Sequence, residues 1–236
     1  MSAGATRIRR LSRLDLAVGA GGWPEVAPFR PEIDAAFAAL TATNPHIWNG
    51  RILLLRDHEI RERTLHGACI ETDFAAFNWW RKRGRDDLGV KNIFGFAAVE
   101  GADGAFLMGV MGDHTASPGR IYFAGGTPEP QDVVDDRLDL RGSAVREMRE
   151  EIGLSEDRAD EADGWDLVEH GLYFGLMRRM RFSRPAAALA AEARAFLARE
   201  VMPELKDVHI IASEQDIVSA VVPFAADYVR WRWAEG

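Results

Sequence analysis

The sequence has almost no cysteine: Cys69 is the only one among 236 residues. One thiol cannot form an intramolecular disulfide or a cysteine-rich zinc site, so the composition suits a reducing compartment. Long apolar runs are also absent, because Glu192 and Arg194 interrupt the longest alanine-rich stretch, residues 185–196, and a spanning helix needs about 20 apolar residues. We therefore expect a cytoplasmic protein without a membrane-spanning segment.

An excess of positive charge is missing as well. The chain has 29 Lys and Arg residues against 37 Asp and Glu residues, for a formal net charge of -8. Such a surface repels nucleic-acid phosphates, which argues against a non-specific nucleic-acid binder. The arginines at positions 7, 9, 10 and 13 precede no apolar segment, so a first strand or a flexible start is favoured over a targeting peptide. With 47% hydrophobic residues, the chain can bury the core of one or two domains.

Apolar periodicity and turn residues predict a mixture of helices and strands without repeats. Helices are expected over residues 31–42, 74–83, 143–152, 185–201 and 223–233, and strands over 51–56, 64–70, 93–99, 105–111, 120–123, 166–170, 172–182 and 208–212. Thr72 or Asp73 can cap the second helix, and Gly153 ends the third. The change near residue 90 from loops and helices to strands predicts an amino-terminal subdomain, residues 1–90, and a second domain, residues 91–236.

The second expected helix carries both aromatic and basic residues. Phe74, Phe77 and Trp80 share one side of it, which is more typical of a core than of a base-stacking surface. The basic run at positions 81–83 lies where cations complement the carboxyl end of the helix dipole. A solvated helix end is therefore favoured over a phosphate site.

Residues 146–154 carry the most informative chemistry. At about 100° per residue, Glu147, Glu150 and Glu151 fall within an arc of about 100° on a helix. Carboxylates at this spacing repel one another, and a divalent cation would offset that repulsion. Oxygen ligands select Mg²⁺ or Mn²⁺ over zinc, and such a metal would assist attack by water on a phosphate ester or anhydride. The competing interpretation is a solvated acidic face.

This segment resembles the carboxyl-terminal half of the Nudix box, which runs Arg-Glu, an apolar residue, any residue, Glu-Glu, any residue, Gly and an apolar residue. Residues 125–129, Gly-Gly-Thr-Pro-Glu, precede it by about twenty residues. The resemblance implies an α+β fold, a Nudix-type α/β/α sandwich with a mixed sheet and an amino-terminal subdomain. It also implies a metal-dependent pyrophosphohydrolase with Mg²⁺ or Mn²⁺ as cofactor, and a homodimer, because many Nudix hydrolases pair.

By the same resemblance, the catalytic set consists of Glu147, Glu150, Glu151 and Arg146. The three glutamates would bind the metal and help to activate water. Arg146 would orient them through hydrogen bonds and charge, and Gly126 would offer its backbone carbonyl to the metal.

The first half of the box departs from the family pattern. Five residues separate Gly126 from the next position of the box, where the chain has Asp132 instead of glutamate, and thirteen residues instead of seven then lead to Arg146. Six residues are therefore inserted. The carboxylates that could replace the missing one are Asp132, which is favoured, Asp135, Asp136 and Asp139. The general base stays open between a box glutamate and Glu129, Glu169 or Glu214, and His114 and His170 are interpreted as structural.

Substrate markers are sparse. Gly119 followed by residues 123–126 resembles the end of the coenzyme A diphosphatase motif, and residues 44–50 and 71–74 resemble the branch that cleaves UDP-sugars. The proline of many ADP-ribose pyrophosphatases has no counterpart between residues 165 and 172. We expect a small-molecule nucleoside diphosphate derivative, of nucleotide-sugar, ADP-ribose or coenzyme A type.

Two alternatives accompany this expectation. One is a non-catalytic nucleotide-binding sensor on the same fold. The other is an isopentenyl-diphosphate isomerase, which needs a reactive cysteine. Cys69 lies in an apolar strand, which favours a buried structural thiol instead.

Overall fold

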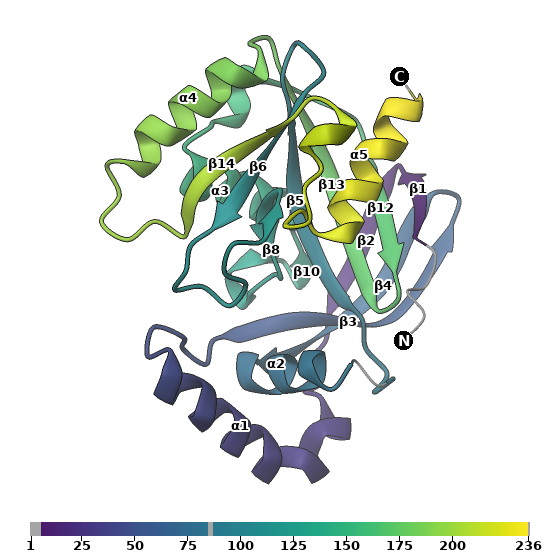
Figure 1. The fold of residues 1–236 in the computed structure, drawn as a ribbon. Helices are drawn as coiled ribbons and strands as arrows, with labels where there is room; N and C mark the ends of the chain where they lie inside the picture. Colours follow the sequence, from purple (N-terminus) through teal and green to yellow (C-terminus); the bar gives the residue numbers. More distant parts are fainter. Residues whose placement is uncertain (1–5, 85–86, 236) are drawn as a thin grey trace.

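Two β-sheets and the helices that cover them make up the computed structural model, which describes residues 6–84 and 87–235 (Figure 1). The large sheet contains β1 (Arg7–Leu11), β5 (Asn92–Glu100), β6 (Phe106–Met111), β7 (Ile121–Tyr122), β8 (Ala124–Gly126), β11 (Ala159–Glu161), β12 (Trp165–His170), β13 (Tyr173–Phe182) and β14 (Leu205–Ile211). The small sheet contains β2 (Arg13–Val18), β3 (Arg51–Arg61), β4 (Thr64–Asp73), β9 (Val133–Val134) and β10 (Arg137–Leu138). The helices are α1 (Arg30–Thr43), α2 (Phe74–Lys82), α3 (Leu140–Ile152), α4 (Ala186–Leu197) and α5 (Pro223–Glu235).

The large sheet is mixed. Its main path runs β1-β12-β13-β5-β6-β14, while the short strands β11, β7 and β8 pair with β13, β6 and β5. Only β13 and β5 are parallel in this sheet; its other pairs are antiparallel. The small sheet has the order β3-β4-β2-β10-β9, in which β2 and β4 are parallel.

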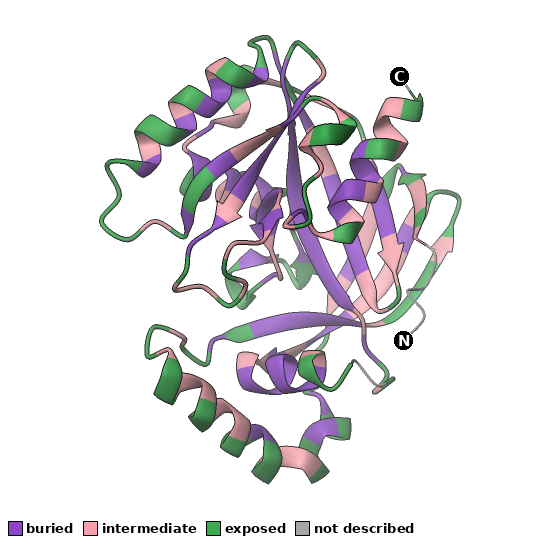
Figure 2. Cartoon of the chain, viewed as in Figure 1, coloured by how far each residue is buried: buried purple, intermediate pink, exposed green. Residues whose placement is uncertain are grey.

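Helices cover both faces of the large sheet, as the alternation along β5 requires. Phe94 and Phe96 point to one face and pack in a core with Tyr228 of α5. Ala97 and Val99 point to the other face and pack with α3 and α4 (Figures 1 and 2). The predicted α+β fold, an α/β/α sandwich around a mixed sheet, is confirmed.

The amino-terminal region folds mainly around the small sheet. Ile52 and Leu54 of β3 face Trp80 of α2 and Ile33 of α1. The two regions exchange strands, because β1 pairs with β12 in the large sheet and β10 pairs with β2 in the small one. The division at residue 90 stays a prediction.

All five predicted helices are present, with differences at their ends. The prediction to residue 201 was too long for α4, which ends at Leu197, six residues before Pro203. The predicted strand 120–123 is interrupted at Phe123, which separates β7 from β8. The sequence prediction missed the six-residue strand β2 and also β9, β10 and β11. The last three have two or three residues, too few to show alternation.

Cys69 lies on β4 and is fully buried in the core between the two sheets. Burial raises the pKa of its thiol to about 12, so it carries no thiolate at neutral pH. Within the described ranges, none of the helices has the length and apolar character needed to cross a membrane.

Asp73 joins α2 to the helix before it. Its carboxylate accepts the Ala76 N–H at 2.8 Å, as predicted for a cap, and accepts two bonds from Arg30 at 2.7 and 3.2 Å. Burial acts to raise the pKa of Asp73, but these bonds outweigh it and the pKa is lowered. The resulting stabilisation is present above the unfolded-state pKa of about 3.9 and is lost as the pH falls through the lowered folded-state pKa.

We expect Asp73→Asn to lower the free energy of unfolding by about 1 kcal/mol at pH 7, because the neutral amide keeps the cap but weakens the Arg30 pair. Urea unfolding measured from pH 7 downward should show the difference shrinking below about pH 4. The control is Asp34→Asn, since Asp34 also faces Arg30 but is exposed; it should stay within about 0.5 kcal/mol of wild type. A difference for Asp73→Asn that does not change with pH would contradict the charge explanation.

Candidate active site

Local signals place the acidic helix α3. Asp139 caps its first turn by accepting the Gly142 N–H at 2.9 Å, and Gly153 ends it in the left-handed conformation, at φ 68°, which glycine adopts without strain. Met148 and Ile152 pack fully into the core beneath the sheet. The glutamates of the helix consequently lie along its other side.

Arg146 forms ion pairs with three carboxylates of this region. Its guanidinium contacts Asp132 at 2.9 Å, Glu147 at 2.7 Å and Glu150 at 3.1 Å. The Asp132 side chain is 3% exposed, and its other oxygen accepts the Glu129 N–H at 2.9 Å. Asp132 thus fixes both Arg146 and the loop in front of the helix, and its role as a replacement for the box glutamate stays a prediction.

Glu151 and Glu147 are neighbours, and the pKa values of both carboxyl groups are raised. Burial raises the pKa of Glu151 well above its ordinary value, and the charges of Glu204 and Glu147 add to this effect. Burial likewise raises the pKa of Glu147 to about 7, with Arg146 opposing and Glu150 and Glu204 reinforcing the shift. The Gly125 N–H donates to the Glu151 carboxylate and acts in the opposite direction.

Glu204 is the acidic residue that sequence reasoning missed. It precedes β14, where its carbonyl accepts the Gly112 N–H at 2.8 Å. Burial raises the pKa of its carboxyl group, His114 acts to lower it, and Glu129 raises it further. No spacing rule links position 204 to the helix glutamates, because the pairing of β14 with β6 brings it there.

Of the remaining predicted residues, two line the cavity described below and three lie outside it. Gly126 and Glu129 line the same cavity as Glu204. Glu150 is on the outer side of α3, with 61% of its side chain exposed. Elsewhere on the molecule, Glu169 pairs with an arginine of β1 and Glu214 pairs with one of α5.

One of the two histidines lies near the site and the other does not. The charge of His114 acts to lower the pKa of the Glu204 carboxyl group. His170 shares a hydrogen bond of 2.9 Å with Thr6, away from the glutamates. The interpretation of His170 as a structural residue agrees with this contact, whereas His114 borders the site.

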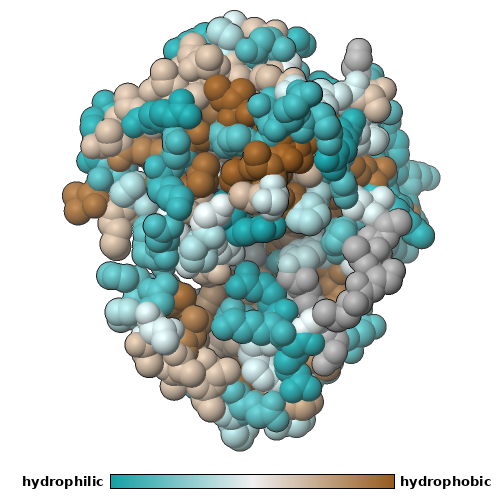
Figure 3. Space-filling view, in the orientation of Figure 1, coloured by the Kyte–Doolittle hydropathy of each residue, from teal (hydrophilic) through white to brown (hydrophobic). Residues whose placement is uncertain are grey.

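A cavity of about 380 Å³ opens beside these carboxylates. The space-filling view shows a hollow across this face, between the part of the molecule that carries α1 and the part above it (Figure 3). The lining is strongly aromatic: Phe74 and Phe77 of α2 face Phe94 and Phe96 of β5, Tyr122 of β7, Tyr173 of β13 and Phe224 of α5. The rings of Phe96 and Phe224 are stacked, with centroids 5.8 Å apart. Aromatic side chains of this kind can stack on a planar ring.

Arg81 adds a cation to this cavity. It is partly buried, its guanidinium stands 5.7 Å from the centre of the Phe77 ring, and Asn78 accepts one of its hydrogen bonds at 3.2 Å. Burial lowers its pKa, with Tyr122 opposing, and in the described part of the chain no carboxylate forms an ion pair with it. Lys82 is exposed, and Arg83 pairs with Glu32 at 3.3 Å. The basic run is thus divided, and one member faces the cavity.

The donors around the helix suit a hard divalent cation in kind. The glutamates and the Gly126 carbonyl offer oxygen only, and burial, with neighbouring carboxylates adding to it, raises the pKa values of Glu147, Glu151 and Glu204. Over residues 6–84 and 87–235, no three acidic, histidine or cysteine side chains are gathered closely enough to enclose a metal ion. Mg²⁺ does not require such a cage, since it is commonly held by one or two carboxylates, waters and substrate phosphates.

Comparison with known proteins gives similarities of fold only. No protein-family model and no curated protein matches this sequence. Among solved structures, the MutT protein from Methanosarcina mazei is 16% identical with a TM-score of 0.41, over 61% of this chain and 93% of its own. A Nudix hydrolase from M. smegmatis is 15% identical with a TM-score of 0.38, over 61% and 83%. A Deinococcus radiodurans protein, DR0079, is 12% identical with a TM-score of 0.40, over 77% and 98%. At these TM-scores the similarities carry no conclusion about chemistry.

Proposed function

We propose that this chain is a Nudix hydrolase that cleaves the pyrophosphate linkage of a nucleoside diphosphate derivative with the help of Mg²⁺ or Mn²⁺. The observation that carries this proposal is the meeting of Glu147, Glu151 and Glu204 beside an aromatic cavity. Glu151 is buried and Glu147 is partly buried, and carboxylates that repel one another in such a place cost stability unless a cation joins them. The sequence resemblance of residues 146–154 to the Nudix box supports the same assignment.

Glu147, Glu150, Glu151 and the Gly126 carbonyl would hold the metal. When bound, the ion supplies charge neutralisation of the phosphate oxygens and lowers the pKa of water. Arg146 keeps Glu147 and Glu150 in place, since it contacts both. Glu204 and Glu129 border the cavity and are the candidates to accept a proton from the attacking water.

The aromatic walls and Arg81 would bind the rest of the substrate. A nucleobase can stack between the α2 and β5 sides, while Arg81 donates to a phosphate or another anionic group. This assigns substrate recognition partly to α2, in the amino-terminal region. It leaves nucleotide sugars, ADP-ribose and coenzyme A as the substrate classes to test.

Arg81→Ala is expected to raise KM by about tenfold or more and to change kcat less, because the lost hydrogen bonds bind substrate in the ground state as well as in the transition state. Steady-state kinetics on the best substrate measures both constants. Lys82→Ala, one residue further on the exposed side of the helix, serves as the control and should keep both constants. An unchanged KM for Arg81→Ala would remove Arg81 from the binding site.

The experiment that tests the function is product release from UDP-glucose, ADP-ribose, coenzyme A, diadenosine polyphosphates and nucleoside triphosphates, each with Mg²⁺, Mn²⁺ or chelator. Cleavage that depends on the metal is the expected result, and the preferred substrate identifies the class. Nucleotide binding without cleavage of any of them would favour the sensor alternative. Light scattering on the same protein tests the proposed homodimer.

A further inference from the structure

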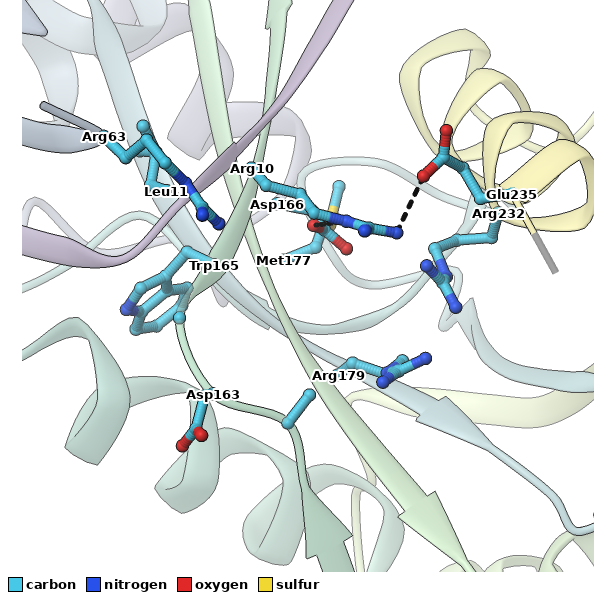
Figure 4. Close-up of a pocket in the computed structure, with 12 residues that line it drawn as sticks. Arg10, Leu11, Arg63, Asp163, Trp165, Asp166, Met177, Arg179, Arg232 and Glu235 are labelled. Atoms are coloured by element: carbon cyan, nitrogen blue, oxygen red, sulfur yellow. Dashed lines mark ion pairs between the residues drawn. The ribbon is translucent and has the colours of Figure 1, made fainter.

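A second cavity, of about 300 Å³, lies between β1, β12, β13 and the end of α5 (Figure 4). It shares no lining residue with the cavity beside α3. Four arginines line it: Arg10, Arg63, Arg179 and Arg232. Against them stand three acidic residues, Asp163, Asp166 and Glu235, so the lining carries a formal charge of +1 in a chain whose net charge is -8.

Three of the guanidinium groups crowd around one buried carboxylate. Arg10 lies 3.9 Å from Asp166 and 2.8 Å from Glu235. Burial raises the pKa of Asp166, while a hydrogen bond from Tyr228 and the charges of Arg232, Arg10 and Arg179 act to lower it. Asp166 is therefore within electrostatic reach of all three arginines. Figure 4 shows their side chains gathered on the same side of the cavity.

Two of these arginines, Arg179 and Arg232, have N–H groups that no ion pair among the described residues uses. The ion pairs formed by the described residues that line this cavity all belong to Arg10. Among the described residues, Arg179 and Arg232 have no carboxylate within ion-pair distance, and the Nε of Arg232 is buried with no hydrogen-bond partner there. A buried donor left unpaired costs about 1–3 kcal/mol, and neighbouring like charges add to that cost. An anion with several oxygen atoms would accept hydrogen bonds from the unpaired donors and would offset the repulsion between the positive charges.

We propose that this cavity binds a diphosphate group, free or carried by a nucleotide, at a site separate from the candidate active site. The planar guanidinium fork matches phosphate oxygens with two parallel bonds. Arg179 and Arg232 donate to the ligand, and Arg63 adds positive charge at the cavity wall. Asp166, which accepts a hydrogen bond from the Tyr228 hydroxyl at 3.1 Å, holds Arg10 at the edge of the cavity. The cavity volume lies at the lower end of the range for small-molecule sites.

The test is calorimetric titration of the full chain with pyrophosphate, in low salt, in a buffer without phosphate and with a chelator that removes divalent metals. We expect one pyrophosphate per chain. Arg179→Gln and Arg232→Gln should each weaken binding by about tenfold or more, and the double variant should abolish it. Raising the salt concentration should weaken binding too. Thermal unfolding of each variant shows that it is folded.

Two further variants separate this site from the rest of the molecule. Arg181→Gln alters an exposed arginine of the same strand that faces Glu100 at 3.8 Å and should bind pyrophosphate as wild type does. Repeating the titrations in an Arg81→Ala background removes the cation of the other cavity, so the binding that is left reports the cavity of Figure 4 alone. Titrations with inorganic phosphate and with ADP distinguish a free diphosphate from a nucleotide-borne one. No binding of pyrophosphate or ADP, or binding that survives the Arg179→Gln, Arg232→Gln double change, would overturn the proposal. Because the readout is binding without metal, the result does not depend on the proposed hydrolase activity.

Discussion

Glu151→Gln is expected to lower kcat by about a thousandfold on the substrate that the panel identifies, while the melting temperature stays equal to that of wild type or rises. The loss follows from the proposed role, because an amide is a poor ligand for Mg²⁺ and stabilises less positive charge near the reacting phosphate. The gain in stability follows from burial. Glu151 is 8% exposed and faces Glu147 and Glu204, and a neutral isostere removes that repulsion.

A fall in kcat without a fall in melting temperature distinguishes a functional carboxylate from a structural one. A residue retained for packing would lose stability when changed, whereas a strained site residue loses activity alone. Glu59→Gln is the matched control, since Glu59 is an exposed glutamate of β3 that pairs only with Arg61; it should leave both quantities unchanged. If Glu151→Gln kept full turnover, the assignment of α3 to catalysis would fail.

Gly125→Ala is expected to destabilise the fold by about 3 kcal/mol or more and to reduce the amount of active protein accordingly. Gly125 has φ 134°, a conformation that side-chain-bearing residues rarely adopt, and an added Cβ would stand 2.1 Å from the carbonyl oxygen of Gly95 on β5. That oxygen belongs to the sheet backbone and cannot move away cheaply. The same peptide donates its N–H to Glu151, so any local shift also disturbs the acidic site.

The next residue offers a matched control for stability. An added Cβ at Gly126 would meet no atom within 4 Å, and Gly126 does not have a positive φ. Gly126→Ala should therefore unfold at nearly the wild-type denaturant concentration, as measured by urea titration followed by tryptophan fluorescence. Equal destabilisation by the two substitutions would show that the close contact at Gly125 does not determine the stability of this turn.

Several elements could be predicted from the sequence because their causes are local. The acidic helix has its buried side and its terminating Gly153 within one short segment, and both are present in the structure, although the helix begins at Leu140, three residues before the predicted start, behind the cap Asp139. The hairpin of β5 and β6 likewise follows from alternation and a short turn. Helical periodicity also predicted that Phe77 and Trp80 would be buried, as they are. The same pattern could not show that Phe77 also lines a cavity.

The different positions of the basic residues 81–83 could not be predicted from the sequence. A helix end favours cations at all three positions, and nothing in the run distinguishes Arg81 from its neighbours. Only the packing of α2 against the small sheet, across the cavity from β5, directs Arg81 into the aromatic cavity and leaves Lys82 exposed. The loop ahead of α3 is similar, because the contact between Asp132 and Arg146 spans the six inserted residues.

By itself, the sequence determined the helices, most of the strands, the acidic face of residues 147–151 and the oxygen-only chemistry of that face. These features depend on backbone hydrogen bonds and on side-chain spacing within one turn or one strand. The tertiary structure decided that Glu204 meets the helix glutamates, that their pKa values rise, and that four arginines surround a second cavity. Burial and electrostatic coupling arise between residues that are distant in sequence, so they exist only once the strands have paired.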